Sequence, residues 1–144
     1  LRVSPNVRFF GSAGWILWPE YARRYGGELV DPRALAGVYR ASRLNVNNSA
    51  WPLHFRTLDV LGCGAAVMIN RVRRPDVDEH FHTDFQPGVH YVPYDLEDFE
   101  DAATRCLRDE TARVRMGAAA ARVIAAKHLW RHRAGQILAD LGAL

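Results

Sequence analysis

Asn47, Asn48 and Ser49 form a short polar run between an expected strand and an expected helix. The alternating residues 43–47 (RLNVN) predict the strand, and Pro52 begins the helix, which ends at a glycine turn. Free amides at the amino end of a helix attract anions, and amide and hydroxyl side chains add neutral hydrogen-bond donors. The pattern predicts a site for an anionic group, such as a phosphate, where the strand meets the helix.

Arg56 and Asp59 lie three residues apart on the same expected helix, so their side chains project to one side. Arginine binds phosphate and carboxylate in a bidentate manner, and an ionised carboxylate accepts hydrogen bonds from hydroxyl groups. Two interpretations fit this pair. It is either part of a ligand site or a surface ion pair beside a capped turn, and spacing alone favours the ion pair.

Other acidic and histidine residues have the spacing of metal ligands. Asp76 and Asp78 form an Asp-X-Asp pair, but they follow a run of arginines and Pro75, so we favour first-turn acids of a short helix. His80 and His82 have zinc-ligand spacing without an evident third ligand. We expect neither a metal nor another cofactor.

Short apolar stretches alternate with longer amphipathic ones, which is typical of βαβ units. The sequence predicts an α/β fold, a Rossmann-like parallel sheet with helices on both faces and a helical C-terminal tail. Strands are expected at residues 7–10, 29–30, 43–47, 65–69 and 89–92, with 65–69 central and buried. Helices are expected at residues 19–25, 32–42, 52–62, 96–108, 111–127 and 130–141, with a short helical turn near 77–81.

The composition suits one globular domain over residues 1–144 and excludes disordered and fibrous classes. The net charge is +3, a modest excess that suits a phosphate ligand without requiring nucleic acid. The longest apolar run, residues 60–69, is shorter than the roughly 20 residues of a membrane span. Cys63 and Cys106 match no zinc spacing, so we expect a reduced, cytoplasmic protein.

We favour structural roles for three tryptophans and three arginines of the sequence. Trp15, Trp18 and Trp51 lie near candidate loops and could stack on a base or sugar ring, but we favour a role in the core or at a domain interface. We expect three arginines of the Ala-rich helix to form a solvated face rather than a nucleic-acid surface, because no aromatic residues interleave with them. These are Arg113, Arg115 and Arg122.

The segments 39–42 (YRAS), 44–47 (LNVN) and 56–64 (RTLDVLGCG) resemble the donor-binding half of group 1 glycosyltransferases, in particular their CgeB-like spore-maturation branch. The similarity covers the chain from about residue 9 onward, and the 56–64 segment is its most specific part. It continues through Phe81, Pro87-Gly88, Tyr91, Tyr94-Asp95, His128 and His132-Arg133.

The resemblance implies the C-terminal Rossmann-like domain of a two-domain GT-B enzyme that binds a nucleotide-diphosphate sugar. Asp59 stands where the family has the acidic residue that hydrogen-bonds the ribose hydroxyls, and Arg56 would hold that carboxylate or contact the diphosphate. Asn47, Asn48 and Ser49 would lie near the phosphate or sugar. The glycine turn after the first expected strand would bring backbone amides near the phosphates. Its residues are Gly11, Ser12, Ala13 and Gly14.

By the same resemblance, transfer would be independent of metal and would retain the anomeric configuration. The acceptor-binding domain would lie upstream of Leu1 and supply the base, so the isolated chain would bind nucleotide without transferring sugar. The helical tail would dock on that domain, and no catalytic residue is identified within the chain. Trp51 stands where many members have a sugar-contacting glutamate. This departure favours an alternative, a non-catalytic α/β nucleotide-binding or protein-interaction module derived from the glycosyltransferase fold.

Overall fold

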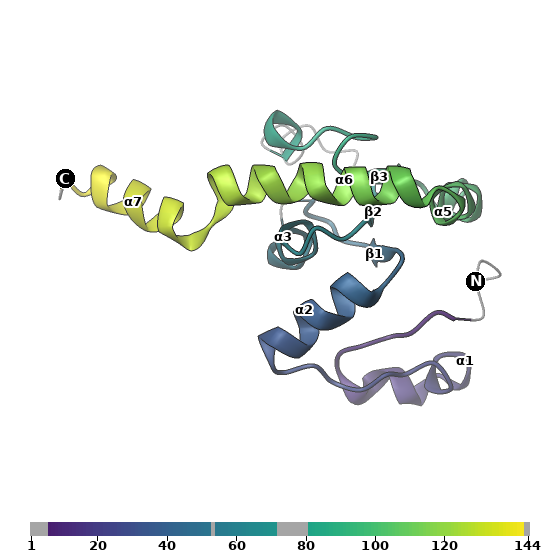
Figure 1. Cartoon of the computed structure of the whole chain (residues 1–144). Coiled ribbons are helices and arrows are strands. Elements are labelled where there is room, and N and C mark those ends of the chain that lie inside the picture. The colour runs from purple at the N-terminus through teal and green to yellow at the C-terminus, as the bar shows by residue number, and fades with distance from the viewer. Residues whose placement is uncertain (1–5, 53, 72–80, 143–144) are drawn as a thin grey trace.

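The computed structural model of the chain describes residues 6–52, 54–71 and 81–142. A parallel sheet forms its centre and helices surround it (Figure 1). The helical elements are the 3-10 helix η1 (Ala13–Leu17), α1 (Pro19–Ala22), α2 (Pro32–Ala41), α3 (Phe55–Gly62), a turn at residues 81–84, α5 (Phe99–Arg108), α6 (Glu110–Val123), the π-helix η2 (Ile124–His128) and α7 (Trp130–Asp140).

The described sheet has three strands in the order β1 (Asn45–Asn47), β2 (Val67–Asn70) and β3 (Val92–Tyr94). Both pairs are parallel, with Met68 of β2 opposite Val46 on one side and Val92 on the other. The apolar β2 is central and almost wholly buried, as its sequence predicts.

Helices cover both faces of the sheet. Val67 and Ile69 pack with α3, α6 and the 81–85 segment, whereas Met68 packs on the opposite face with Ala102 and Ala103 of α5. Successive side chains of a strand point to opposite faces, so the three residues of β2 serve two cores. The predicted Rossmann-like α/β fold is confirmed.

The close approach of α6 to the turn after α3 depends on two glycines. Gly64 has φ +70°, which ends α3 in a left-handed turn. A Cβ on Gly117 would lie 2.0 Å from the carbonyl oxygen of Gly64. The helix therefore packs directly on this backbone. Ile124, in the following η2, packs against Gly62 of α3.

Arg113 does not belong to the solvated face predicted for α6. Its side chain turns inward, the residue is 6% exposed, and it donates hydrogen bonds to the carbonyls of Cys106 and Leu107 at 2.7 and 2.6 Å. These are carbonyls at the carboxyl end of α5, which have no partner within the helix. Arg115 and Arg122 are exposed as expected.

The amino-terminal segment differs from the prediction, because residues 7–10 and 29–30 do not form strands of the sheet. Phe9 makes only an isolated bridge to Tyr25, and its ring packs against Trp15 and Tyr21 at 5.2 and 5.0 Å. This local aromatic cluster takes the place of sheet pairing. The helix predicted at 19–25 is the shorter α1, since Tyr25 belongs to the bridge.

Two further elements begin three residues later than predicted. Residues 86–90 form a turn in which Gln86 accepts the amides of Val89 and His90, so the last strand begins at residue 92. The helix expected from residue 96 begins at 99, because the Asp98 carboxylate accepts the Asp95 amide in a preceding turn.

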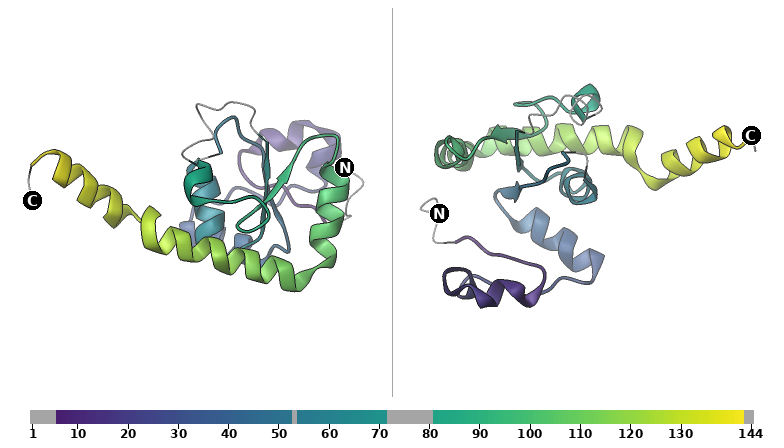
Figure 2. Two further views of the ribbon diagram at one scale, coloured as in Figure 1. Left: turned by 90° about the horizontal axis from the view of Figure 1, so that it is seen from above. Right: turned by 180° about the vertical axis from the view of Figure 1, so that it is seen from behind.

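The helix expected to run through residues 111–127 is interrupted. It passes from α6 into the π-helix η2 and stops at Leu129, whose extended backbone (φ −75°, ψ 153°) redirects the chain. The following α7 projects away from the sheet, as Figures 1 and 2 show. No helix among the described residues is long and apolar enough to cross a membrane.

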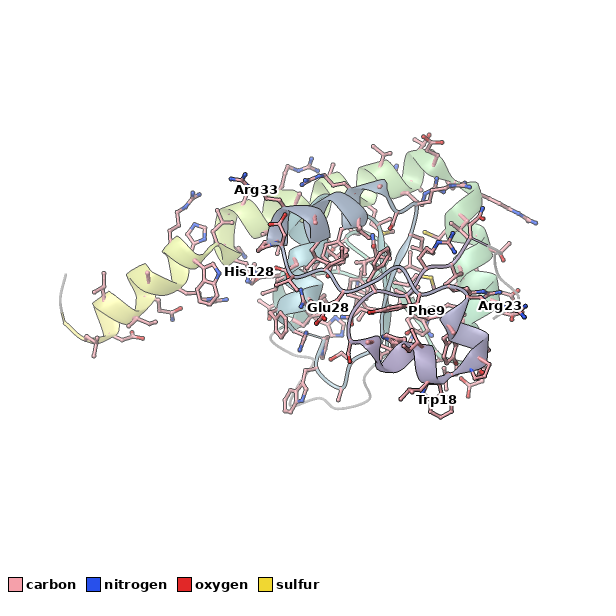
Figure 3. All side chains as sticks on the ribbon, turned by 90° about the horizontal axis from the view of Figure 1, so that it is seen from below. Phe9, Trp18, Arg23, Glu28, Arg33 and His128 are labelled. Carbon is pink, nitrogen blue, oxygen red and sulfur yellow. The ribbon has the colours of Figure 1, made fainter. Side chains whose placement is uncertain are left out.

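The three tryptophans expected in the core or at a domain interface lie at the surface, so they do not belong to the core. Trp15, Trp18 and Trp51 are 38%, 59% and 55% exposed. Figure 3 shows Trp18 at the outer edge of the amino-terminal segment. The apolar residues of the neighbouring η1, Ile16 and Leu17, are exposed as well, so this segment contributes little to the main core.

Candidate functional site

The carboxyl ends of the strands meet the amino end of α3, as the sequence predicts. Asn47, the last residue of β1, donates a side-chain hydrogen bond to the hydroxyl of Thr57 in the first turn of α3. Its carbonyl accepts a hydrogen bond from the Tyr94 hydroxyl at 3.2 Å. Asn47 thus joins β1 to both α3 and β3, and Thr57 is fully buried at this junction.

A second asparagine, Asn70 at the end of β2, holds the loop that follows β1. Its Oδ1 accepts the Ser49 amide at 2.8 Å, and its Nδ2 donates to the Ser49 carbonyl at 3.0 Å. The Ser49 hydroxyl in turn accepts the Trp51 amide at 3.1 Å. The polar groups of Ser49 are used by the loop itself, whereas Asn48 is exposed and hydrogen-bonds to none of the described residues.

The helix α3 begins three residues after the predicted position, because His54 caps it. The His54 Nδ1 accepts the amide of Arg56 at 3.2 Å, and the helix begins at Phe55. The Arg56 amide is therefore hydrogen-bonded within the protein, whereas the sequence predicted that the free amides at this helix end would bind an anion. The Arg56 guanidinium lies over the Phe55 ring, 5.0 Å from its centre.

The predicted pair of Arg56 and Asp59 is present, but its charged groups are not in close contact. The nearest charged atoms are 3.8 Å apart, and the two side chains are 49% and 48% exposed. Two exposed charges at this separation stabilise the fold by at most about 1 kcal/mol. Both side chains therefore remain available to a ligand at little cost.

Tyr39 of α2 lies beside this pair. Burial raises the pKa of the Tyr39 hydroxyl, while the charges of Arg56 and Asp59 act on it in opposite directions. On α3, Asp59 and the sheet-facing Thr57 are about 200° apart around the axis. Asp59 therefore lies on the opposite side of α3 from Thr57, near Tyr39 of α2.

The glycine turn predicted to approach phosphates lies elsewhere. The Gly11 amide donates to Gly27 at 3.1 Å, the Gly11 carbonyl accepts the Tyr25 hydroxyl at 2.8 Å, and Ser12 caps η1 through the Gly14 amide. Figure 1 shows this segment on the opposite side of α2 from α3. The structure therefore does not bring Gly11, Ser12 and Gly14 together with Asn47 and Asp59, because residues 7–10 are not in the sheet.

An arginine that sequence reasoning missed follows β2 directly. Arg71 donates to the carboxylates of Asp95 and Asp98 at 2.8 and 3.0 Å. These bonds raise the pKa of Arg71. The hydrogen bond from the Asp95 amide, followed by the one from Arg71, lowers the pKa of Asp98. The guanidinium is already paired, so it contributes more to holding the loop after β3 than to binding an anion.

Thr57, Asn70 and Tyr94 are also absent from the predicted site. The signal for Asn70 was available, because a polar residue ends the apolar run of the central strand, just as Asn47 ends β1. Polar residues at the carboxyl ends of neighbouring parallel strands meet at the same edge. Thr57 and Tyr94 gave no such signal, since each looks like an ordinary core residue in the sequence.

The candidate metal ligands fall mostly on residues that the structure does not describe. Asp76, Asp78 and His80 lie outside the described residues, and His82 is 3.3 Å from the Tyr91 hydroxyl. Within the part of the chain that the structure describes, no three His, Cys, Asp or Glu side chains gather as a ligand set.

Comparison with protein families matches residues 2–139 of the chain to a family described as glycosyl transferase-like. The match includes the strands, the Arg56 and Asp59 pair, and the helical elements from η1 through α7 except the last residue of α7. No curated protein matches the chain.

Proposed function

The chain belongs to the glycosyl transferase-like family, and from this premise we propose that it binds the sugar donor of a glycosyltransferase. The donor is a nucleotide-diphosphate sugar, bound where the carboxyl ends of β1 and β2 meet the amino end of α3. Ligands of open parallel sheets bind at this edge because the strand ends and helix amino ends converge there.

One observation carries the proposal, the hydrogen-bonded loop between β1 and α3. Asn70 fixes Ser49 through two bonds, and Asn47 fixes the first turn of α3 through Thr57. A loop held on both sides keeps the exposed Asn48 and the neighbouring Arg56 in place. An amide and a guanidinium next to a helix amino end suit the oxygens of a diphosphate.

Asp59 supplies the second half of the proposed donor site. Its carboxylate is about half exposed and can accept hydrogen bonds from the two ribose hydroxyls. The 3.8 Å separation from Arg56 lets the guanidinium turn toward a diphosphate while the carboxylate holds the ribose. We assign Asp59 to the ribose and Arg56 and Asn48 to the phosphate or sugar. Asn47 and Ser49, whose polar groups hydrogen-bond within the protein, lie beside them and hold the loop in place.

We further propose that this domain works with an acceptor-binding domain that is not part of the sequence described. The exposed apolar residues of α7 and its C-cap Leu141 suit such a contact, since four of them lie on one side of the helix. These are Trp130, Ile137, Leu138 and Leu141, which are 89%, 58%, 45% and 75% exposed.

The remaining features of the proposal follow from the resemblance to group 1 enzymes and their CgeB-like branch. Transfer proceeds without a metal, retains the anomeric configuration and takes place in the cytoplasm. The acceptor-binding domain supplies the base. The 144-residue chain alone binds donor and transfers nothing.

Nucleotide titration tests the donor site. Uridine, guanosine and adenosine diphosphates are added at millimolar concentration, and thermal unfolding and calorimetry report binding. We expect one of them to stabilise the chain, by about 2.7 kcal/mol at 100 times its Kd. Asp59→Ala should remove this effect, while Asp140→Ala, which removes an exposed carboxylate from α7, should not. A lack of stabilisation by all three nucleotides would contradict the proposal.

A second candidate, nucleotide binding without transfer, is favoured by Trp51. This indole stands where many members have a sugar-contacting acid, next to the Ser49 loop, and it is 55% exposed. If it covers the sugar position, a diphosphate sugar will bind no more tightly than the matching diphosphate. Trp51→Ala should then increase affinity for the sugar nucleotide alone. Tighter binding of the sugar nucleotide to the unaltered chain would favour the transferase.

A further inference from the structure

A groove lies along α6, away from the donor site. It has a volume of about 350 Å³ and runs between the helix and the loop that precedes β3. Figure 2 shows that loop passing beside α6. The lining residues are Gly88, Val89, Ala112, Arg115, Met116, Ala119 and Arg122.

The groove has an apolar floor and one basic wall. Small side chains and Met116 form the floor, and Val89 borders the opposite side while remaining 47% exposed. Arg115 and Arg122 are two helical turns apart, about 10 Å along the axis, on the same side of α6. Their long side chains can reach one anion placed between them.

Neither arginine has a hydrogen-bond or ion-pair partner among the residues that the structure describes. Both are exposed, and neither forms an ion pair with any residue in the described part of the chain. This distinguishes them from Arg113 and Arg71, which bind carbonyls or carboxylates. Two guanidiniums without an ion-pair partner among the described residues therefore lie beside an apolar floor.

His90 adds a neutral group near this wall. Its Nδ1 accepts the Gln86 amide at 2.9 Å, and burial, together with the charge of Arg122, lowers its pKa. At neutral pH the imidazole is therefore uncharged, and the positive charge at the groove comes from the two arginines.

We propose that this groove binds a small organic anion, an apolar ring or chain that carries a phosphate or carboxylate group. The apolar part lies on Ala112, Met116 and Ala119, and the anionic group binds Arg115 and Arg122. The volume is in the range of small-molecule sites, roughly 300–1,000 Å³. The site is separate from the donor site, and the proposal does not depend on the proposed function.

The two methionines of the chain offer a selective measurement. Met116 lines the groove, whereas Met68 is fully buried in β2. With labelled methionine methyl groups, 1-naphthyl phosphate should shift the Met116 signal in a saturable manner and leave the Met68 signal in place. Inorganic phosphate and 1-naphthol, which each supply one half of the ligand, should bind at least tenfold more weakly.

Variants separate the groove from other sites for anions. Arg115→Gln with Arg122→Gln should weaken binding of 1-naphthyl phosphate at least tenfold, and Ala119→Phe should block it by filling the floor. Arg33→Gln, on the exposed surface of α2, should leave affinity unchanged, and so should Asp59→Ala. The proposal is overturned if the Met116 signal does not move, if 1-naphthol binds as tightly, or if the double arginine variant retains full affinity.

Discussion

The Nε2 of His128 lies 3.0 Å from the Oδ2 of Asp84, which joins the end of η2 to the helical turn at residues 81–84. On its other side, the His128 Nδ1 is 3.2 Å from a guanidinium nitrogen of Arg133. Arginine can only donate, so Nδ1 accepts a hydrogen bond from Arg133, and Nε2 carries the ring proton and donates a hydrogen bond to Asp84. His128 is thus a neutral link between the core and α7 (Figure 3).

This link predicts that the fold loses stability as the pH falls. Burial lowers the pKa of His128 below its ordinary value of 6.5, despite the opposing charge of Asp84. The unfolded chain therefore binds more protons than the folded one as the pH falls through 6.5. The stability from this group is complete well above pH 6.5 and is lost progressively as the pH falls from there toward the lower pKa of the folded state. We expect the Tm to be several degrees lower at pH 5.5 than at pH 7.5.

His128→Asn should flatten this decline, because the variant lacks the titrating group. Arg33→Gln, on the exposed surface of α2, removes a group that does not titrate in this range, so it serves as the control and should retain the decline. His90 has a pKa lowered in the same direction, so His90→Asn should remove a further part. An unchanged pH profile in the His128 variant would contradict the assignment.

The contact between Gly117 and Gly64 predicts opposite effects for two glycine substitutions. Gly117→Ala forces α6 away from the Gly64 carbonyl and should destabilise the fold by about 3 kcal/mol. A Cβ on Gly135 of α7 meets nothing within 4 Å, so Gly135→Ala should stabilise by roughly 0.5–1 kcal/mol through helix propensity. Urea unfolding at equilibrium measures both. Equal changes in the free energy of unfolding would show that the close contact between Gly117 and Gly64 does not contribute to stability.

We expect a large loss of stability when Arg113 is replaced, although this residue looks like a surface cation in the sequence. Arg113→Gln leaves the carbonyls of Cys106 and Leu107 without their donor and should cost about 1–3 kcal/mol. Arg115→Gln on the same helix should change stability by less than about 0.5 kcal/mol. Thermal unfolding of the two variants compares them, and similar Tm values would argue against a structural role for Arg113.

Asn70 is predicted to position the proposed donor site without touching the nucleotide. Asn70→Ala removes both bonds to Ser49 and should weaken nucleotide diphosphate binding several-fold, with a loss of about 1–2 kcal/mol in stability. Gln136→Ala removes an exposed amide from α7 and should change neither quantity. Binding by calorimetry at a temperature where both variants are folded separates positioning from unfolding. Unaltered affinity in Asn70→Ala would exclude the positioning role.

Local signals in the sequence were sufficient for several elements. Asp31 and Pro32 predicted the start of α2, where the Asp31 carboxylate accepts the amides of Arg33 and Ala34. The apolar run 65–69 predicted the central strand. In these places the cap or the hydrophobic pattern lies within a few neighbouring residues, so no distant contact was needed.

The errors occur where distant residues compete. The pattern at residues 7–10 favours a strand, but Phe9 packs instead on Trp15 and Tyr21, which the pattern does not include. Arg113 looked solvated because the carbonyls it binds belong to the preceding helix. An alternating pattern in the sequence shows that a segment can form a strand. It does not show which strand or side chain the segment will contact.

The candidate site likewise contains contacts that the sequence predicts and contacts that it does not. The spacing of Arg56 and Asp59 was enough to predict their contact, because a helix fixes neighbours three residues apart. The bonds of Asn70 to Ser49 join residues 21 positions apart, and they follow only from the parallel pairing of β1 and β2.

The outer side of β1 leaves the sheet open to extension. Among the described residues β1 pairs only with β2, and Val46 at its middle is 53% exposed. A three-residue edge offers few backbone groups, so a strand from another molecule would gain little by adding to it at high protein concentration. A strand tethered to the same polypeptide loses less entropy on joining, and could widen the sheet here without disturbing β2, β3 or the groove on α6.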